Sequence, residues 1–273
     1  MAGNSTHPGL SVVSKAVTIL GVFSEERTEL ALTDLARATA MPTSTVHRLV
    51  QELVECGALE RTAAGRYVIG LRLWGIAARS PHNYALSDAA TPYMQKVLAT
   101  THGHVHLAAL HGQGALVLEK LSWPSAKKTI SRTGSKMPLH ASAAGQVLLA
   151  YAPRAFQETV LAAPLIAFTP NTVTDPLILR RMLAVIRQEG VSKSLGQLVA
   201  GMDACAAPVF WPDQRVAGSI AGIADSGSYR MADMERAVRR AAKGLTDFLA
   251  TPESAVGPHA SFHAGLRPVA HAE

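Results

Sequence analysis

The sequence predicts a two-domain α+β protein. Residues 11–70 contain three amphipathic segments of helical period, followed by two strand-like segments around a glycine. Residues 102–250 mix strands and helices without strict alternation, which is typical of an α+β domain. With 273 residues, of which 48% are hydrophobic, the chain can bury two separate cores. We assign residues 71–101 to a linker with connecting helices and residues 251–273 to a disordered tail.

Composition excludes several classes of protein. The longest apolar stretches fall short of the roughly 20 residues that a bilayer span needs, and no apolar segment follows a basic one at the N-terminus. Two cysteines, Cys56 and Cys205, give no disulfide framework. We therefore expect a soluble cytoplasmic protein without membrane partners. The net charge is +6, but residues 1–80 hold eight basic and seven acidic residues, so charge alone supports a DNA partner weakly.

Two helices are expected near the N-terminus. An apolar stripe at three- and four-residue spacing predicts a helix from Ser14 to Phe23, with Ala16, Ile19, Leu20 and Phe23 on one face. Thr33 is a suitable N-cap for a short helix at Asp34–Thr39, which places an acid in the first turn. The turn Ala40-Met41-Pro42 follows.

A third helix and a hairpin complete the first domain. The helix is expected at Thr43–Cys56, with Gly57 at its C-terminal cap and Val46, Leu49, Val50 and Leu53 on its apolar face. Strands at Leu59–Thr62 and Arg66–Ile69 enclose a turn containing Gly65. Three helices and a hairpin in this order predict a winged helix-turn-helix domain.

The polar face of the third helix is a candidate for reading DNA in the major groove. Hydroxyls in its first turn suit base edges, the longer polar side chains can reach bases, and Arg48 suits a phosphate or a guanine edge. Glu52 and Glu55 are expected to face away from the duplex. The candidate contacts are Thr43, Ser44, Thr45, His47, Arg48 and Gln51 on the helix, with Arg61 and Arg66 on the hairpin. The alternative is an ordinary solvated helix face and a solvated hairpin.

The remaining elements are predicted from periodicity. Helices are expected at Leu71–Arg79, Ala85–Thr101, Ser142–Tyr151, Pro176–Gln188 and Met231–Leu249. Pro92 is expected to break or bend the second of these helices. Strands are expected at His104–Leu110, Ala115–Leu121, Lys128–Arg132, Asp203–Trp211 and Val216–Ala224.

Several segments resemble one family of proteins. SKAVTILGVF, LTDLARATAMPTSTVHRLVQELVECG and GRYVIGLRLWGIA resemble the head of the IclR family of transcription regulators, while RTGSKMPLHASAAGQVLLAY and VAGSIAGIA resemble its second domain. The resemblance implies a linker helix, a GAF-like effector-binding domain around an antiparallel sheet, and homodimers or dimers of dimers. It also implies an operator in double-stranded DNA, a small-molecule effector, no catalysis and no cofactor.

Two positions depart from the family pattern. Ala40 stands where a turn glycine is usual, which costs about 1 kcal/mol if the position needs a positive φ. Thr43 stands where a lysine is common, which removes one phosphate contact.

The start of the helix at Ser142 is a candidate effector site. Ser142, Ala143, Ala144 and Gly145 carry little bulk, so backbone N–H groups there can bind an anion; close packing of the helix on the sheet is the alternative. The resemblance adds Ser194, Ala204, Ala221 and Ile223 as effector contacts. Three of these four positions have lost polarity, so we expect a bulkier, partly apolar effector such as an organic or aromatic acid.

Other chemistries are less well supported. His102, His104, His106 and His111 cluster, and two of them share a strand face, as two metal ligands can; hydrogen-bonded or surface histidines are the alternative. Cys205 lies in an apolar strand without a nucleophile motif, so a core thiol is expected. The rival functions are an enzyme with an appended winged-helix head and a ligand-binding module that has lost DNA binding. The sequence shows neither an enzyme motif nor a damaged third helix.

Overall fold

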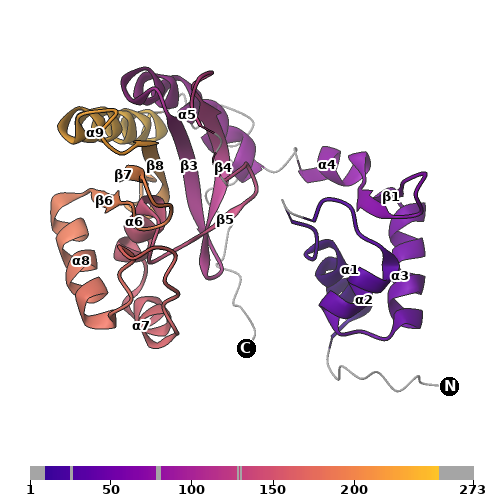
Figure 1. Cartoon of the computed structure of the whole chain (residues 1–273). Helices are drawn as coiled ribbons and strands as arrows, with labels where there is room; N and C mark the ends of the chain where they lie inside the picture. The colour runs from indigo at the N-terminus through magenta and orange to yellow at the C-terminus, as the bar shows by residue number, and fades with distance from the viewer. Residues whose placement is uncertain (1–9, 25–26, 78–80, 128, 130, 252–273) are drawn as a thin grey trace. The chain divides into compact units, whose positions relative to one another are not determined.

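The chain folds into two compact units, residues 1–80 and 81–273 (Figure 1). The computed structural model describes residues 10–24, 27–77, 81–127, 129 and 131–251, and the side chains of 81–85 are not described. The predicted tail at 251–273 lies outside this range except for its first residue.

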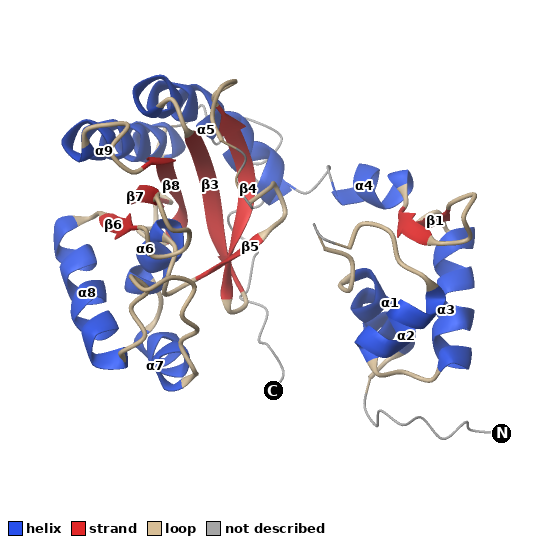
Figure 2. Ribbon diagram, viewed as in Figure 1, coloured by secondary structure: helices blue, strands red, loops and turns tan. Residues whose placement is uncertain are grey.

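The first unit is a winged helix, as predicted. Its helices are α1 (Val12–Leu20), α2 (Leu32–Thr39), α3 (Thr43–Glu55) and α4 (Leu71–Ala77), and its strands are β1 (Leu59–Arg61) and β2 (Tyr67–Ile69). The strands form an antiparallel hairpin (Figure 2), and Leu30 adds a bridge to Tyr67. The predicted apolar face of α3 is buried, and it packs with Ile19 and Leu35 in the core of this unit.

The start of α2 differs from the prediction. The N-cap is Ala31 rather than Thr33, which lies inside the helix. Because an alanine side chain cannot accept a hydrogen bond, Asp34 reaches back, and its Oδ2 accepts from the Ala31 N–H at 3.1 Å. At the other end Ala40 has φ 53° and ψ 24°, the left-handed conformation in which glycine is unstrained.

The end of α3 is fixed by a Schellman motif. Gly57 has a φ of +71°, its N–H donates to the Val54 carbonyl at 2.9 Å, and the Ala58 N–H donates to the Leu53 carbonyl at 2.8 Å. These bonds satisfy carbonyls that a helix end would otherwise leave open, so the chain turns sharply into the hairpin.

The second unit is built on a six-stranded antiparallel sheet in the order β5-β4-β3-β8-β7-β6. The strands are β3 (His104–His111), β4 (Gly114–Ser122), β5 (Lys136–Pro138), β6 (Ser192–Leu195), β7 (Met202–Phe210) and β8 (Val216–Asp225). The helices are α5 (Pro81–Thr101), α6 (Ala143–Tyr151), α7 (Arg154–Ala162), α8 (Pro176–Glu189) and α9 (Met231–Leu249). The predicted α+β class with an antiparallel sheet is confirmed.

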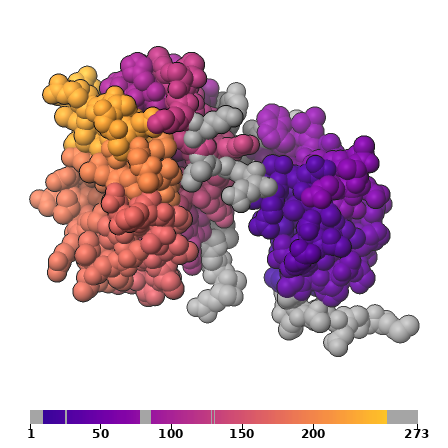
Figure 3. Space-filling view, viewed as in Figure 1, coloured from indigo at the N-terminus to yellow at the C-terminus, as the bar shows by residue number. Residues whose placement is uncertain are grey.

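The sheet separates two apolar cores (Figure 1). Helices α5 and α9 cover one face, and α6, α7 and α8 cover the other. Alternation along β3 directs Val105 and Leu107 to the first core and Ala108 to the second. Helix α5 contributes to the first core, although its residues were predicted to belong to the linker. In Figure 3 the salmon to yellow part of this unit presents closely packed side chains on the face in view.

Other differences from the predicted elements have local causes. Helix α5 continues through Pro92, whose ring is exposed, so the carbonyl that lacks a partner can bond to water. Residues 128 and 130 of the predicted strand at Lys128–Arg132 lie outside the described part, and the described residues there are not strand. The Lys120 ammonium donates to Thr129 Oγ1 and to the Ser131 carbonyl. The third strand of that region is β5 instead. Helix α7 and strand β6 were not predicted.

No described helix is long and apolar enough to span a bilayer.

Candidate functional site

The outer face of α3 is open to solvent. Thr43, Ser44, His47 and Arg48 are exposed, while Thr45 and Gln51 are half-buried. Within the described chain, none of these six side chains has a hydrogen-bond or ion-pair partner. A helix with one buried face and one polar face without intramolecular partners has the properties of a recognition helix. Glu52 and Glu55 are also exposed, further along the helix.

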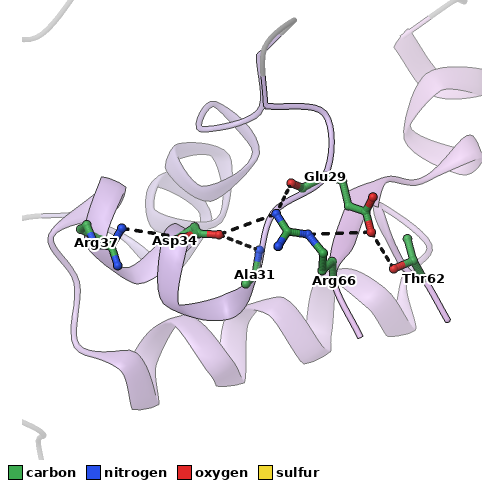
Figure 4. A network of polar contacts seen from close by, with 6 residues as sticks. All are labelled: Glu29, Ala31, Asp34, Arg37, Thr62 and Arg66. Atoms are coloured by element: carbon green, nitrogen blue, oxygen red, sulfur yellow. Dashed lines mark hydrogen bonds and ion pairs between the residues drawn. The ribbon is translucent and has the colours of Figure 1, made fainter. Parts of the chain in front are cut away.

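The two hairpin arginines have different environments. Arg61 on β1 is exposed and has no partner in the described chain. Arg66 lies within a network that joins the hairpin to the start of α2 (Figure 4). Its Nη2 donates to the Glu29 carbonyl at 2.8 Å, and its guanidinium lies 3.9 Å from carboxylate oxygens of both Glu29 and Asp34. Thr62 Oγ1 donates to the same Glu29 carboxylate at 2.9 Å.

This network changes the interpretation of Arg66. Two carboxylates compensate its charge, and its hydrogen bond to the Glu29 backbone fixes where the hairpin sits against the helices (Figure 4). Arg66 is therefore engaged inside the first unit, whereas the residue pattern predicted the same candidate role for Arg66 and Arg61. The spacing of the two arginines could not separate them, because the partners of Arg66 lie 32 and 37 residues earlier in the chain.

The second unit contains a cavity of about 60 Å³ between α6 and the sheet. Its wall is mostly apolar, and its polar residues come from β3, the segment before β5, the start of α6 and β6. The lining residues are His106, Thr129, Ser131, Met137, Ser142, Ala143, Ala144, Ser194, Leu198, Val199, Met202, Ala204, Ala221 and Ile223.

Seven of the eight predicted effector residues line this cavity. The exception is Gly145, where an added Cβ would lie 2.6 Å from the Pro138 carbonyl oxygen, so its role is close packing. The two interpretations of the small-residue segment thus divide between neighbours, since Ala143 and Ala144 face the cavity while Gly145 packs. The Ser194 hydroxyl donates to the Ala141 carbonyl at 3.0 Å.

The start of α6 can bind an anion. Ser142 is its N-cap, and the Ser142 hydroxyl accepts from the Gly145 N–H at 3.1 Å and donates to the Pro138 carbonyl at 2.7 Å. The N–H groups of Ala143 and Ala144 have no partner in the described chain. Unpaired N–H groups at the positive end of a helix dipole are suited to a carboxylate.

A second polar group in the cavity was not predicted as an effector contact. His106 Nε2 lies 2.9 Å from Ser131 Oγ, which lies 3.3 Å from Thr129 Oγ1, and Thr129 Oγ1 accepts from Lys120 Nζ at 2.6 Å. Burial lowers the pKa of His106 to about 3, and the nearby charges of Lys120 and His104 add to this effect. The sequence placed His106 only in a possible metal cluster, because Ser131 lies 25 residues away in the chain.

The other candidate chemistries find little support. His104 bonds to Ser122 Oγ at 2.9 Å and to the Lys127 carbonyl at 2.7 Å, and the described residues contain no group of three or more His, Cys, Asp or Glu placed to hold a metal ion. Cys205 points into the core between the sheet and α9, opposite to Ala204, and burial raises the pKa of its thiol to about 12. A thiol with such a pKa is a poor nucleophile.

Comparison with known families agrees with both units. Residues 12–63 match the IclR helix-turn-helix domain, and residues 79–245 match the C-terminal domain of the bacterial transcriptional regulator IclR. The chain belongs to the IclR family. It is thus a DNA-binding transcription regulator, and the expectation drawn from the sequence segments is confirmed.

Members of the IclR family with curated names share most of this chain. The glycerol operon regulatory protein of Streptomyces coelicolor is 27% identical over 243 residues, covering 86% of this chain and 94% of that protein. The HTH-type transcriptional regulator KipR of Bacillus subtilis is 29% identical over 209 residues, covering 76% and 83%. Both relatives are named for regulation rather than for an enzymatic reaction.

Solved IclR structures have the same fold. An IclR homolog of Microbacterium hydrocarbonoxydans, crystallised with 4-hydroxybenzoate, is 33% identical, with a TM-score of 0.81 over 88% of this chain and 99% of that chain. A putative IclR regulator of Silicibacter sp. TM1040 is also 33% identical, with a TM-score of 0.79 over 88% and 96%.

Proposed function

We propose that this IclR regulator binds a specific operator through α3 and that an aromatic organic acid in the α6 cavity controls the binding. The observation that carries the proposal is the cavity itself, whose mostly apolar wall includes Ala143 and Ala144, the residues at the start of α6 whose N–H groups have no partner in the described chain. A ligand that prefers one conformation of the protein changes the affinity for DNA by the ratio of its affinities for the two conformations. No catalytic step is required.

In the proposed DNA complex, exposure decides the roles of the side chains. Ser44, Thr45, His47 and Gln51 lie on the open face of α3 and contact base edges, while Thr43 lies at the helix start. Arg48 and Arg61 are cations without an intramolecular partner in the described chain, so they contact phosphates. Arg66 holds the hairpin in position through Glu29 and Asp34.

We propose that a second copy of the chain pairs with the first unit. Large apolar side chains on α1 and α4 are exposed, namely Val12 (58%), Val13 (71%), Val17 (61%), Leu71 (73%), Trp74 (65%) and Ile76 (58%). Exposed apolar side chains in this number favour burial against a partner. Because one recognition helix covers only a few base pairs, a paired head reading two half-sites is the arrangement that gives useful affinity.

The effector's carboxylate is placed at the N–H groups of Ala143 and Ala144, with its apolar body against Ala204, Ala221 and Ile223. The relative that binds 4-hydroxybenzoate supports this class of ligand. A cavity of about 60 Å³ is smaller than the roughly 150 Å³ known to hold benzene, so a ring enters only if side chains move. Met137 and Met202 in the wall have the flexible side chains that such a movement needs.

Two measurements test this function. Gel-shift titration of the full chain against DNA upstream of its own gene should show tighter binding than to unrelated DNA of equal length. Thermal-shift measurements should show that benzoate or 4-hydroxybenzoate raises the melting temperature of the second unit, since a ligand stabilises the state that binds it. If glyoxylate or pyruvate raises the melting temperature and the aromatic acids do not, the aromatic class is wrong.

A further inference from the structure

The sheet side of the cavity carries a group of polar side chains beside its alanines. Lys120 of β4 faces His106 of β3 across the sheet, and both side chains reach toward the segment at Thr129 and Ser131. His106 is 5% exposed and lines the cavity. Its Nε2 is bonded to Ser131, while its Nδ1 has no hydrogen-bond partner in the described chain. A ring nitrogen without a partner, on a side chain that lines a cavity, leaves a hydrogen bond available to a ligand.

The direction of the chain of contacts is fixed at its lysine end. A lysine ammonium only donates hydrogen bonds, so Thr129 Oγ1 accepts from Lys120 Nζ at 2.6 Å. From this end we infer that the Thr129 hydroxyl directs its own proton to Ser131 Oγ and that the Ser131 hydroxyl donates to His106 Nε2. Because Nε2 accepts, the single proton of a neutral imidazole resides on Nδ1.

His106 remains neutral in this position. Burial is the main cause of its lowered pKa, about 3, and the positive charge of Lys120 acts in the same direction. Its ring therefore presents a neutral N–H donor rather than a cation throughout the physiological pH range. A neutral donor suits a hydroxyl or phenolate oxygen, whereas the α6 N-terminus suits a carboxylate.

We propose that His106 Nδ1–H is a specificity-determining donor of the effector site, selecting aromatic acids that carry a second oxygen on the ring. This inference rests on the proposed effector function and adds a second polar anchor to it. Two anchors on separate walls recognise both ends of a hydroxylated aromatic acid, whereas an unsubstituted acid leaves the buried donor unpaired. Leaving such a donor unpaired is costly, so discrimination is expected.

Isothermal titration calorimetry of the full chain tests the proposal with benzoate, 3-hydroxybenzoate and 4-hydroxybenzoate. In the parent, at least one hydroxybenzoate should bind about tenfold more tightly than benzoate. In His106→Leu this preference should disappear while benzoate binding persists. His104→Leu is the matched control, because His104 lies two residues away on the same strand face, is buried and hydrogen-bonded, and does not line the cavity. It should keep the preference.

The outcomes separate the two proposals. If none of the three acids binds the parent, the aromatic effector function fails. If they bind but no hydroxyl improves affinity, or if His106→Leu keeps the parent's preference, the role of His106 is overturned.

A second measurement remains decisive if His106→Leu does not fold. Nitrogen-15 NMR of histidine-labelled parent should show His106 as the neutral Nδ1–H tautomer at pH 7. An Nε2–H tautomer would overturn the proposal. In Ser131→Ala the fraction of His106 in the Nδ1–H form should fall, because the hydroxyl that donates to Nε2 is removed.

Discussion

The proposed recognition helix and the proposed effector cavity are built in opposite ways. Helix α3 is a single segment of 13 residues, and its candidate DNA contacts are the side chains that the helical period leaves outside the core. The cavity collects side chains from strands and loops spread over more than 100 residues, from His106 to Ile223. A site on one helix is thus encoded locally, whereas a cavity depends on partners that only the fold brings together.

Filling the cavity should produce the largest effect and leave the head untouched. Ala221 is buried, lines the cavity and pairs with His106 across the sheet. Ala221→Leu should weaken binding of 4-hydroxybenzoate by about a hundredfold or more, because the added carbons occupy the ligand's place. Affinity for DNA without ligand should stay within about twofold of the parent. A variant that responds to the ligand like the parent would place the site elsewhere.

The pKa of His106 predicts a loss of stability in acid. Its folded pKa of about 3 lies below the ordinary histidine value of 6.5, so as pH falls below 6.5 the unfolded chain binds a proton that the folded chain does not. Stability should fall by about 1.4 kcal/mol per pH unit, or roughly 2 kcal/mol at pH 5. Urea unfolding of a Trp74→Phe background, followed by Trp123 and Trp211, measures this in the second unit.

His106→Leu should remove that part of the pH dependence. The stability difference between pH 7 and pH 5 should shrink by roughly 2 kcal/mol relative to the parent. Ala221→Leu, which alters the same cavity but keeps His106, is the control and should show the parent's dependence. An unchanged slope in His106→Leu would contradict the neutral, buried state of this ring.

In the head, the three arginines should separate into two groups. Arg48→Ala should weaken DNA binding about tenfold and lower the salt dependence by about one counterion, with a smaller loss of the same kind for Arg61→Ala. Arg66→Ala should instead lower the stability of the first unit, since it removes the hydrogen bond to the Glu29 carbonyl and the cation that Glu29 and Asp34 share. Fluorescence anisotropy at several salt concentrations distinguishes these results. A reduced salt slope in Arg66→Ala with unchanged stability would reverse the assignment.

The smallest expected effect concerns the turn before α3. Ala40 has a φ of 53°, so Ala40→Gly should stabilise the first unit by about 1 kcal/mol. Thermal unfolding followed through Trp74 measures the change. Ala38→Gly, a substitution inside α2, is the matched control and should destabilise by a similar amount. Destabilisation by both glycines would mean that the turn does not hold the left-handed conformation.

Local signals in the sequence were sufficient for most of the fold. The spacing of Val46, Leu49, Val50 and Leu53 identified the buried face of α3, and Gly57 marked its end. The four-residue strand β6 was missed, because so short a segment carries little periodicity. The differing roles of Arg61 and Arg66, and the bond from Ser131 to His106, depend on distant partners. No residue pattern within one segment could show them.

We propose that one chain joins a DNA-reading helix to a separate ligand cavity that controls DNA binding. The most direct test is a DNA-binding titration of the parent, Arg48→Ala and Ala221→Leu, each with and without saturating 4-hydroxybenzoate, using DNA from upstream of the gene. The ligand should change the parent's affinity, Arg48→Ala should bind weakly yet respond by the same factor, and Ala221→Leu should bind like the ligand-free parent and not respond. If the ligand binds the parent but leaves its DNA affinity unchanged, the claim is contradicted.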